Sequence, residues 1–376
     1  MNKNDLLFDF PESLIAQEPL RPSRICSALL NAEGNLSSDS KKNYQQMRSP
    51  KTIEEPAGGR MEGQAAEAAR ELSWDDFLSQ FQDGDVLVLN NTKVLKRRVF
   101  TADGVEILFL STEDQFHWSV LFPSRRYKVG SILCLPGGIE ITLLEKGRPQ
   151  KVKSNQKLNE NYFTQYGELP LPPYIQKARA KRHTQAADET WYQTQWSEKP
   201  GSFAAPTASL HFTQDHLAQL KTRGVEILYL TLHVGLGTFL PVEVEDLSQH
   251  IMHKEWVEVP QSVIQTLESA QHKQKKVWAM GTTVVRALES YACGLLSFDS
   301  ENSTFVGHTD LLILPGFQFK MVHRMLTNFH QPESTLLALV MAFAGVEKVK
   351  NVYQWAIANK FRLFSYGDLS VWERTT

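Results

Sequence analysis

A series of short β-type runs between Asn90 and Gly167, with no helical pattern between them, restricts the folds open to this chain. Turn residues separate the runs, among them Gly104, Gly130 and a Pro136-Gly137-Gly138 triplet. The runs are residues 105–110, 116–122, 131–135 and 139–144. Close spacing of this kind predicts antiparallel strands joined by tight turns, so we expect a small barrel or sandwich in this segment.

The chain on either side of that segment alternates between strand and helix patterns, which is typical of an α/β domain. Predicted buried strands are residues 86–89, 225–232, 277–280 and 311–314, and predicted helices are 215–222, 283–292, 334–343 and 347–360, with a helical turn at 74–78. We therefore predict a large α/β domain, residues 1–89 and 169–376, with a small antiparallel β-barrel domain, residues 90–168, inserted in it.

Residues 37–69 interrupt the first part of the large domain. They are poor in aromatic and β-branched side chains and rich in Ser, Gln, Lys, Glu, Gly and Pro. Such a composition buries too little apolar surface to offset the entropy of ordering. We predict a mobile surface insertion; the alternative is a short helix over the alanine-rich residues 62–70.

Composition excludes several protein classes. Among 376 residues, 40 Lys and Arg balance 42 Asp and Glu, so a uniformly basic nucleic-acid module is not expected, although a local basic patch is compatible. Three scattered cysteines, Cys26, Cys134 and Cys293, favour a reducing cytoplasm over a disulfide scaffold or a thiolate zinc site. No signal peptide and no apolar run of membrane-spanning length is evident.

Two histidines follow strand-like or small-residue segments in the second half. His211 ends a segment of small residues that includes Thr207, a composition that lets the backbone approach a ligand closely. His233 stands near the end of a predicted strand and is followed by Gly235 and Gly237, where ligands collect in open α/β sheets. The alternative for each histidine is a structural hydrogen bond to the backbone.

Residues 280–289 (MGTTVVRALE) follow a predicted strand and open a helix. First-turn amides, a capping Thr282 or Thr283, and Arg286 one turn later would hold a carboxylate or phosphate. The alternative is a capped helix that carries an exposed Arg286–Glu289 pair.

Residues 250–255 (HIMHKE) place His250 and His253 three residues apart, so that they share a face if the segment is helical. With Glu255 or His211 they could ligate zinc, but the spacing is not HExxH, and acid–base chemistry or substrate binding accounts for the same side chains. Our prediction is that no metal is bound. His330 lies in a further polar segment, residues 327–336, which ends in a helix that Ser334 caps.

Three basic clusters border the predicted barrel, and a basic face on a nearly neutral protein is suited to binding a folded RNA through its phosphates. The clusters are Lys93, Lys96, Arg97 and Arg98; Arg125, Arg126 and Lys128; and Lys177, Arg179, Lys181, Arg182 and His183. Tyr127 and Tyr174 are possible stacking partners. Each cluster taken alone is more typical of an ordinary solvated surface.

Taken together, these segments resemble the S-adenosylmethionine:tRNA ribosyltransferase-isomerase family of queuosine biosynthesis. The matching segments are residues 10–17 (FPESLIAQ), 84–92 (GDVLVLNNT), 169–175 (LPLPPYI), 204–208 (AAPTA), 210–212 (LHF), 231–242 (TLHVGLGTFLPV), 250–255, 281–283 with Arg286, 327–336 and 364–368 (FSYGD). They occur in order over nearly the whole chain outside the insertion.

The resemblance implies a monomeric cytoplasmic enzyme with a large α/β domain and an inserted β-barrel. It implies that the ribosyl group of S-adenosylmethionine is transferred and isomerised onto 7-aminomethyl-7-deazaguanine at the tRNA wobble position. The products would be epoxyqueuosine-tRNA, adenine and methionine. S-adenosylmethionine would be a co-substrate, with no prosthetic group required.

With this resemblance, the residues fall into three expected roles. Candidates for proton transfer are His211, His233, His253, Glu255 and His330. Candidates for binding S-adenosylmethionine are Thr207, Gly235, Gly237, Thr282, Thr283 and Arg286. Candidates for binding RNA are Lys93, Arg97, Arg98, Arg125, Arg126, Lys177 and Arg179.

The chain departs from the family pattern at Ala28, at Lys96-Arg97, at Ser209 and at His323. These departures bear on substrate or RNA contacts more than on the fold. Two alternatives therefore accompany the transferase: a non-catalytic or altered-specificity RNA-binding relative, and a metal-dependent hydrolase built on His250, His253 and Glu255.

Overall fold

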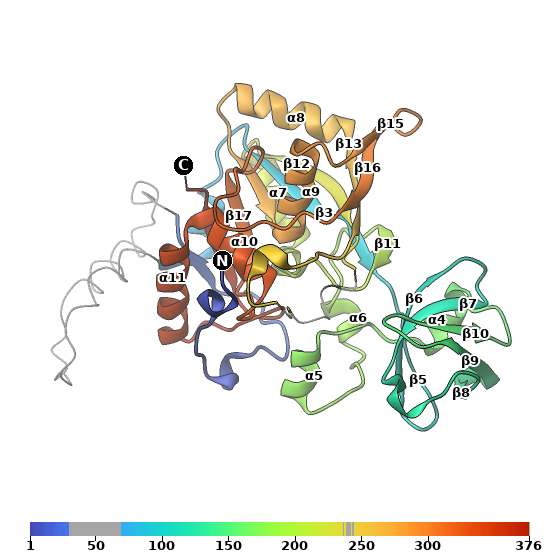
Figure 1. The fold of residues 1–376 in the computed structure, drawn as a ribbon. Coiled ribbons are helices and arrows are strands. Elements are labelled where there is room, and N and C mark those ends of the chain that lie inside the picture. Colours follow the sequence, from blue (N-terminus) through green and yellow to red (C-terminus); the bar gives the residue numbers. More distant parts are fainter. Residues whose placement is uncertain (30–68, 236, 238–241, 243, 376) are drawn as a thin grey trace, which may run out of the picture.

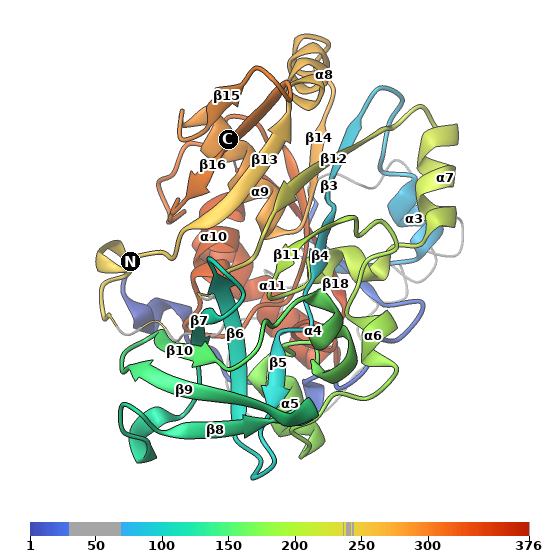
Figure 2. The same cartoon turned by 90° about the vertical axis from the view of Figure 1, so that its right-hand side faces the viewer.

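The computed structural model describes residues 1–29, 69–235, 237, 242 and 244–375. Its larger lobe is built on a ten-stranded mixed sheet (Figures 1 and 2). In spatial order the strands are β15 (Ser297–Asp299), β16 (Thr304–Thr309), β13 (Glu255–Pro260), β12 (Glu226–Leu232), β3 (Val86–Asn90), β14 (Val277–Met280), β17 (Arg324–Asn328), β18 (Leu369–Glu373), β1 (Ile25–Ser27) and β2 (Arg70–Leu72). The four central strands β12, β3, β14 and β17 run parallel.

Helices cover both faces of this sheet because its central strands are apolar on both sides. Along β3, Val86 and Val88 pack in one core and Leu87 and Leu89 in another, the alternation that a pleated strand imposes. The first core includes α8 (Gln261–His272), α9 (Thr282–Ala292), α10 (Thr335–Ala344) and α11 (Val346–Ala358). The second includes α3 (Trp74–Leu78) and α7 (Gln214–Thr222). The result is a three-layered α/β lobe.

The smaller lobe is a six-stranded sheet in which every neighbouring pair is antiparallel. Its strands, in spatial order, are β5 (Arg98–Phe100), β6 (Glu106–Thr112), β7 (His117–Leu121), β10 (Gln150–Ser154), β9 (Ile139–Glu145) and β8 (Ile132–Leu135). Phe109 and Trp118 pack inside against Phe163 of α4 (Glu160–Tyr166). A backbone hydrogen bond from Ala102 to Cys134 joins the two ends, so the sheet is a nearly closed barrel.

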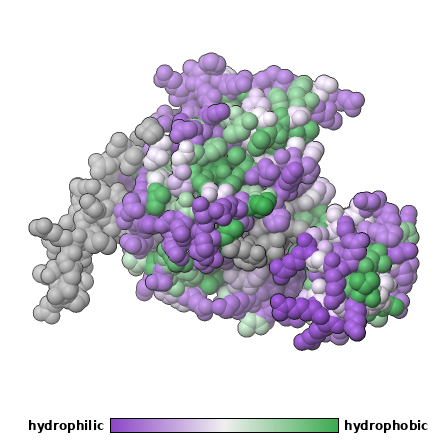
Figure 3. All heavy atoms as spheres, viewed as in Figure 1, coloured by the Kyte–Doolittle hydropathy of each residue, from purple (hydrophilic) through white to green (hydrophobic). Residues whose placement is uncertain are grey.

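Short elements connect the lobes. β4 (Thr92–Val94) pairs in parallel with β11 (Lys199–Ser202), and α5 (Pro173–Arg179) and α6 (Asp188–Trp191) lie between the barrel and β11 in the chain. Within the described residues, the 3-10 helices are η1 (Lys3–Leu6), η2 (Glu12–Leu14), η4 (Ser124–Arg126), η5 (Pro136–Gly138), η6 (Thr207–His211) and η8 (Leu247–Gln249). Figure 3 shows both lobes largely covered by hydrophilic residues, with apolar residues gathered in patches.

The predicted fold class, a large α/β domain with an inserted antiparallel barrel, is confirmed. The domain limits 1–89, 90–168 and 169–376 stay a prediction, with all six barrel strands between Arg98 and Ser154. The insertion predicted at 37–69 lies outside the described residues except for Ala69, which is buried just before β2. In the described ranges, no helix has the length and apolar character to cross a membrane.

The strand predicted at residues 311–314 is wrong. That apolar run has irregular backbone, and Ile313 is buried in the core without any strand pairing. The strand next to β14 is instead β17, whose residues Arg324, Thr327 and Asn328 are polar. A short apolar run signals burial, and burial alone does not specify a strand.

Candidate functional site

A cavity of about 410 Å³ opens where three parallel strands of the large sheet end. Thr327 and Asn328 close β17, Gly281 follows β14, and Val234 follows β12. Carboxyl ends of parallel strands are where open α/β sheets bind ligands. The first turns of α9 and α10 and the residues of η6 complete the wall.

Eight of the eleven residues predicted for proton transfer or S-adenosylmethionine binding line this cavity. They are Thr207, Gly237, His253, Glu255, Thr282, Thr283, Arg286 and His330. His211, His233 and Gly235 do not line it. Residues more than 120 positions apart in the chain are therefore gathered around one space.

Arg286 and Glu255 form a buried ion pair at the cavity wall, with side chains 7% and 6% exposed. Arg286 Nη1 donates to Glu255 Oε2, and the Gly235 amide donates to Glu255 Oε1 at 3.0 Å. The alternative of an exposed Arg286–Glu289 pair is thereby excluded, since Glu289 is buried and accepts the amides of residues 320 to 322. Glu255 therefore orients the Arg286 guanidinium, and the Gly235 amide holds the Glu255 carboxylate in place.

The opening turn of α9 offers free donors to the cavity. Among the described residues, Arg286 Nε and Nη2 and the Thr283 hydroxyl are buried without a hydrogen-bond partner. The expectation that Thr282 or Thr283 caps the helix is wrong, because Gly281 is the N-cap residue and no side chain bonds across the first turn. A helix start that lacks a side-chain cap leaves its first amides available to an anion.

A hydrogen-bonded chain runs from the cavity to His211. The Thr207 hydroxyl donates to Asn328 Oδ1 at 2.8 Å, and Asn328 Nδ2 donates to His211 Nε2 at 2.9 Å. Burial, assisted by the positive charges of Arg362 and Arg21, lowers the pKa of His211 to about 3. His211 is therefore a neutral acceptor behind the wall, and it positions Asn328 and Thr207.

His330 stands in the wall itself. Its Nε2 lies 2.8 Å from the Thr327 hydroxyl, and its backbone amide donates to the Tyr353 hydroxyl at 2.9 Å. Burial lowers the pKa of His330 to about 4, so the imidazole is neutral near pH 7. It can exchange hydrogen bonds with a ligand, and it is a weak base.

His233 lies outside the cavity lining. Its Nδ1 lies 2.7 Å from the Thr92 hydroxyl, and Gly201 packs so closely that an added Cβ would stand 2.6 Å from Nε2. Burial lowers its pKa. These contacts hold His233 between β4 and β12, outside the lining of the cavity, and its role in proton transfer stays a prediction.

The segment that carries His250 and His253 is not helical, so the two histidines do not share a helical face as the metal alternative requires. His253, in contact range of Gly237, and His250 both line the cavity. Within the described part of the chain, no group of three His, Cys, Asp or Glu side chains is placed to hold a metal ion.

The predicted RNA-binding residues divide by exposure. Lys93, Arg125, Arg126 and Lys177 are exposed, and Lys177 pairs with Glu12 at 3.0 Å. Arg97 and Arg98 are buried, paired with Glu160 and Glu168, and Arg179 is enclosed against Asp188 at 2.7 Å. A buried arginine held by a carboxylate does not reach a phosphate on a surface, so the expectation of surface RNA contacts is revised for these three.

The residues that depart from the family pattern do not line the cavity. Ala28 and His323 are held by sheet hydrogen bonds to Val371 and Val277. Lys96 pairs with Glu189, and Ser209 is buried in η6.

Sequence reasoning missed Asn328 and the aromatic residues Tyr174 and Phe364 of the cavity lining. Tyr174 was considered only as a stacking partner for RNA, yet its hydroxyl bonds to Ser365 beside the cavity. Asn328 ends β17, two residues before His330, and a polar residue at the carboxyl end of a parallel strand could have indicated a pocket residue.

Comparisons with known proteins add to this geometry. Residues 60–371 match the family model described as "Queuosine biosynthesis protein". Among solved structures, the chain is similar to the S-adenosylmethionine tRNA ribosyltransferase of Thermotoga maritima, with 25% identity over 98% of this chain and 99% of that chain and a TM-score of 0.49.

Proposed function

This chain belongs to the queuosine biosynthesis protein family, and from that membership we propose that it modifies tRNA with S-adenosylmethionine as co-substrate. The proposed reaction transfers and isomerises the ribosyl group of S-adenosylmethionine onto 7-aminomethyl-7-deazaguanine at the wobble position. Epoxyqueuosine-tRNA, adenine and methionine are the products. The observation that carries the proposal is the set of unpartnered donors on α9, beside aromatic rings in one cavity.

The anionic end of the co-substrate fits the start of α9. Arg286 Nε and Nη2 and the Thr283 hydroxyl are donors without partners, and the methionine carboxylate supplies acceptors for them. Because Arg286 already pairs with Glu255, the carboxylate would share the guanidinium with that residue. Thr282 and the helix amides add positive potential at the same end.

The sulfonium and the adenine suit the aromatic side of the cavity. Faces of aromatic rings attract organic cations, and flat apolar walls accept a purine. Tyr174 and Phe364 supply these rings, and Gly237 leaves room beside His253. The volume of about 410 Å³ lies within the range of about 300–1,000 Å³ common for small-molecule sites.

The chemistry starts from the acidity that the sulfonium confers on its neighbouring 5′ carbon. A base removes a 5′ proton, and the electron pair left on that carbon expels the ring oxygen as an alkoxide. The alkoxide collapses to an aldehyde and expels adenine, which takes up a proton, so a vinyl sulfonium and an aldehyde remain. The substrate amine adds to the vinyl carbon, and the ylide that forms closes on the aldehyde. The resulting alkoxide displaces methionine to form the epoxide.

Of the wall residues, His253 is our candidate for the base, because Glu255 is committed to Arg286 and the pKa of His330 is lowered to about 4. His330 would hold the Thr327 hydroxyl toward the leaving group. Enclosure by Tyr174 and Phe364 would keep water from the reactive intermediates.

The test is adenine release. The protein is incubated with S-adenosylmethionine and tRNA that carries the 7-aminomethyl-7-deazaguanine, and free adenine is quantified; tRNA with guanine at the wobble position is the control. Release that depends on the precursor supports the transferase. Tight tRNA binding without adenine would support the non-catalytic relative, and activity lost to a chelator and restored by zinc would support the hydrolase.

A further inference from the structure

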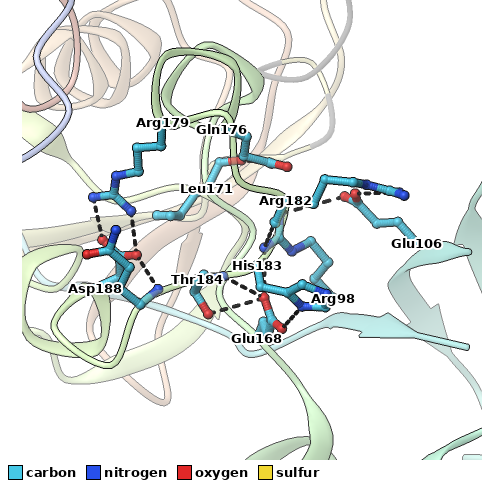
Figure 4. Close-up of polar contacts among 11 residues, drawn as sticks. Arg98, Glu106, Glu168, Leu171, Gln176, Arg179, Arg182, His183, Thr184 and Asp188 are labelled. Carbon is cyan, nitrogen blue, oxygen red and sulfur yellow. Dashed lines mark hydrogen bonds and ion pairs between the residues drawn. The ribbon is translucent and has the colours of Figure 1, made fainter. Parts of the chain in front are cut away.

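A second cavity, of about 400 Å³, lies between the barrel and the segment that leads into and follows α5. Its apolar lining includes Leu108 and Leu121 of β6 and β7, Phe122, and Leu171. Its volume, too, is within the range of small-molecule sites, about 300–1,000 Å³. Figure 4 shows three charged side chains of the lining, those of Arg98, Arg182 and Glu106, close together.

Arg98 is the buried anchor of this cavity, with only 1% of its side chain exposed. Its Nη2 donates to Glu168 Oε2 and to the Arg182 carbonyl, both at 2.8 Å. Its Nε and Nη1 have no hydrogen-bond partner among the described residues, and Nη1 is 3.8 Å from the nearest Glu106 oxygen. Buried donors without partners are costly, so an acceptor that enters here would be bound strongly.

The Glu168 carboxylate keeps Arg98 in this place. Besides Arg98 it accepts hydrogen bonds from the Thr184 amide at 2.8 Å, and it lies 2.7 Å from His183 Nδ1 (Figure 4). These hydrogen bonds and the charge of Arg98 hold the pKa of Glu168 below its usual value despite partial burial. Glu168 therefore stays ionised, and the guanidinium has a fixed orientation.

The charge of the lining favours an anion. Arg98, Arg148 and Arg182 carry three positive charges. Glu106 is the single carboxylate among the described lining residues, and Glu168 pairs with Arg98 from outside the lining, so one positive charge is in excess. Arg182 Nη2 is 3.6 Å from Glu106, and Arg148 is exposed. Arginines next to an apolar, partly aromatic floor suit a nucleotide. Its phosphate would lie at the arginines and its base over Leu121 and Phe122.

The second cavity backs onto the first. Pro170, Leu171 and Pro173 line the second cavity, and Pro172 and Tyr174 line the first. A single stretch of chain, residues 170–174, is thus the wall between them. A nucleotide in the second cavity would lie across this segment from the nucleotide that reacts.

We propose that the second cavity binds one unstacked nucleotide of the RNA substrate, close in sequence to the nucleotide that is modified. This inference rests on the proposed function, which supplies the RNA. Binding the neighbouring nucleotide would position the reacting base, because the RNA backbone links the two. The proposal assigns Arg98, Arg148 and Arg182 to phosphate binding within a cavity.

Equilibrium binding of a fluorescent anticodon stem-loop RNA tests the proposal without any need for turnover. Arg148→Gln and Arg182→Gln each remove one charge, and Leu121→Trp fills the apolar floor without changing charge. Arg223→Gln, on an exposed side chain at the end of α7, is the matched control. Thermal unfolding of each variant verifies that it is folded.

We expect each arginine variant to weaken RNA binding about tenfold, and to reduce the salt dependence by about 0.7 in log–log slope. Leu121→Trp should weaken binding as well. Replacing one nucleotide that flanks the wobble position by an abasic residue should weaken binding to the wild type, and it should have little further effect on Leu121→Trp. Arg223→Gln should bind as the wild type does.

Wild-type RNA affinity in folded Arg148→Gln, Arg182→Gln and Leu121→Trp would overturn the proposal. So would binding of a free nucleoside 5′-monophosphate that depends on Arg148 and Arg182 while RNA affinity does not, since the cavity would then serve a free ligand. If the wild type releases no adenine but the variants still lose RNA affinity, the transferase is refuted and the nucleotide site stands. Adenine release with unchanged RNA affinity would refute the nucleotide site alone.

Discussion

Arg286 is the residue whose surroundings differ most from those of an ordinary surface arginine. It is paired with Glu255 on one side, and it has two unpartnered nitrogens in the cavity wall. Lysine at this position keeps the charge and loses the fork of donors. We expect Arg286→Lys to raise the KM for S-adenosylmethionine about ten- to hundredfold, with a smaller effect on the KM for tRNA. Steady-state kinetics measures both KM values, with Arg223→Lys as the control. An unchanged KM for S-adenosylmethionine in Arg286→Lys would contradict this assignment.

His253 is expected to act in proton transfer. His253→Ala should reduce turnover about 10²- to 10⁴-fold, the usual contribution of a general base, while the melting temperature stays near that of the wild type. His272→Ala, at the exposed end of α8, is the control. Wild-type turnover in His253→Ala would remove this histidine from the catalytic set.

His211 makes stability depend on pH. Its pKa is about 3 in the folded chain, against about 6.5 in an unfolded chain. Between these values the unfolded state binds a proton that the folded state does not, so the free energy of unfolding falls as pH is lowered, by about 1.4 kcal/mol per pH unit for this group. Urea unfolding of His211→Asn between pH 4 and 7 should show a shallower fall, with His330 responsible for part of the remainder. Parallel curves for variant and wild type would exclude this role.

At the scale of elements, the start of α9 depends on Gly281. Its φ of +93° is a conformation that L side chains rarely adopt, and it directs the first helical turn toward the cavity. Gly281→Ala should cost about 1–3 kcal/mol of stability from backbone strain and should also raise the KM for S-adenosylmethionine. Gly294, just beyond the other end of α9, has φ of +73° and open space around its Cα. Gly294→Ala should destabilise comparably with no change in KM; equal KM values in the two variants would place the anion elsewhere.

Elements with a clear period were predictable. The strand expected at 225–232 is β12 at Glu226–Leu232, and the helix expected at 215–222 is α7 at Gln214–Thr222. β17 was missed because Arg324, Thr327 and Asn328 break its apolar pattern, while the 311–314 run is apolar and irregular. Burial of a run depends on its neighbours in three dimensions, which local sequence does not specify.

At the scale of the whole molecule, the family and the architecture could be predicted, and the roles of single site residues could not. The α/β pattern and the turn spacing of the barrel are local properties, so they can be recognised from a single sequence. The Arg286–Glu255 pair, the Thr207–Asn328–His211 chain and the unpartnered nitrogens of Arg98 depend on contacts between distant segments. The second cavity has the same origin, because the barrel and residues 170–182 form it together.

The central claim is that the enzyme uses the ribosyl group of S-adenosylmethionine. Two preparations of the co-substrate, one labelled with ¹³C in the ribose and the other in the methyl group, are each incubated with the enzyme and precursor tRNA, and the tRNA nucleosides are analysed by mass spectrometry. The account predicts that ribose label enters the modified nucleoside while methyl label leaves with methionine. Methyl label in the tRNA, with the ribose label retained in S-adenosylhomocysteine, would contradict it.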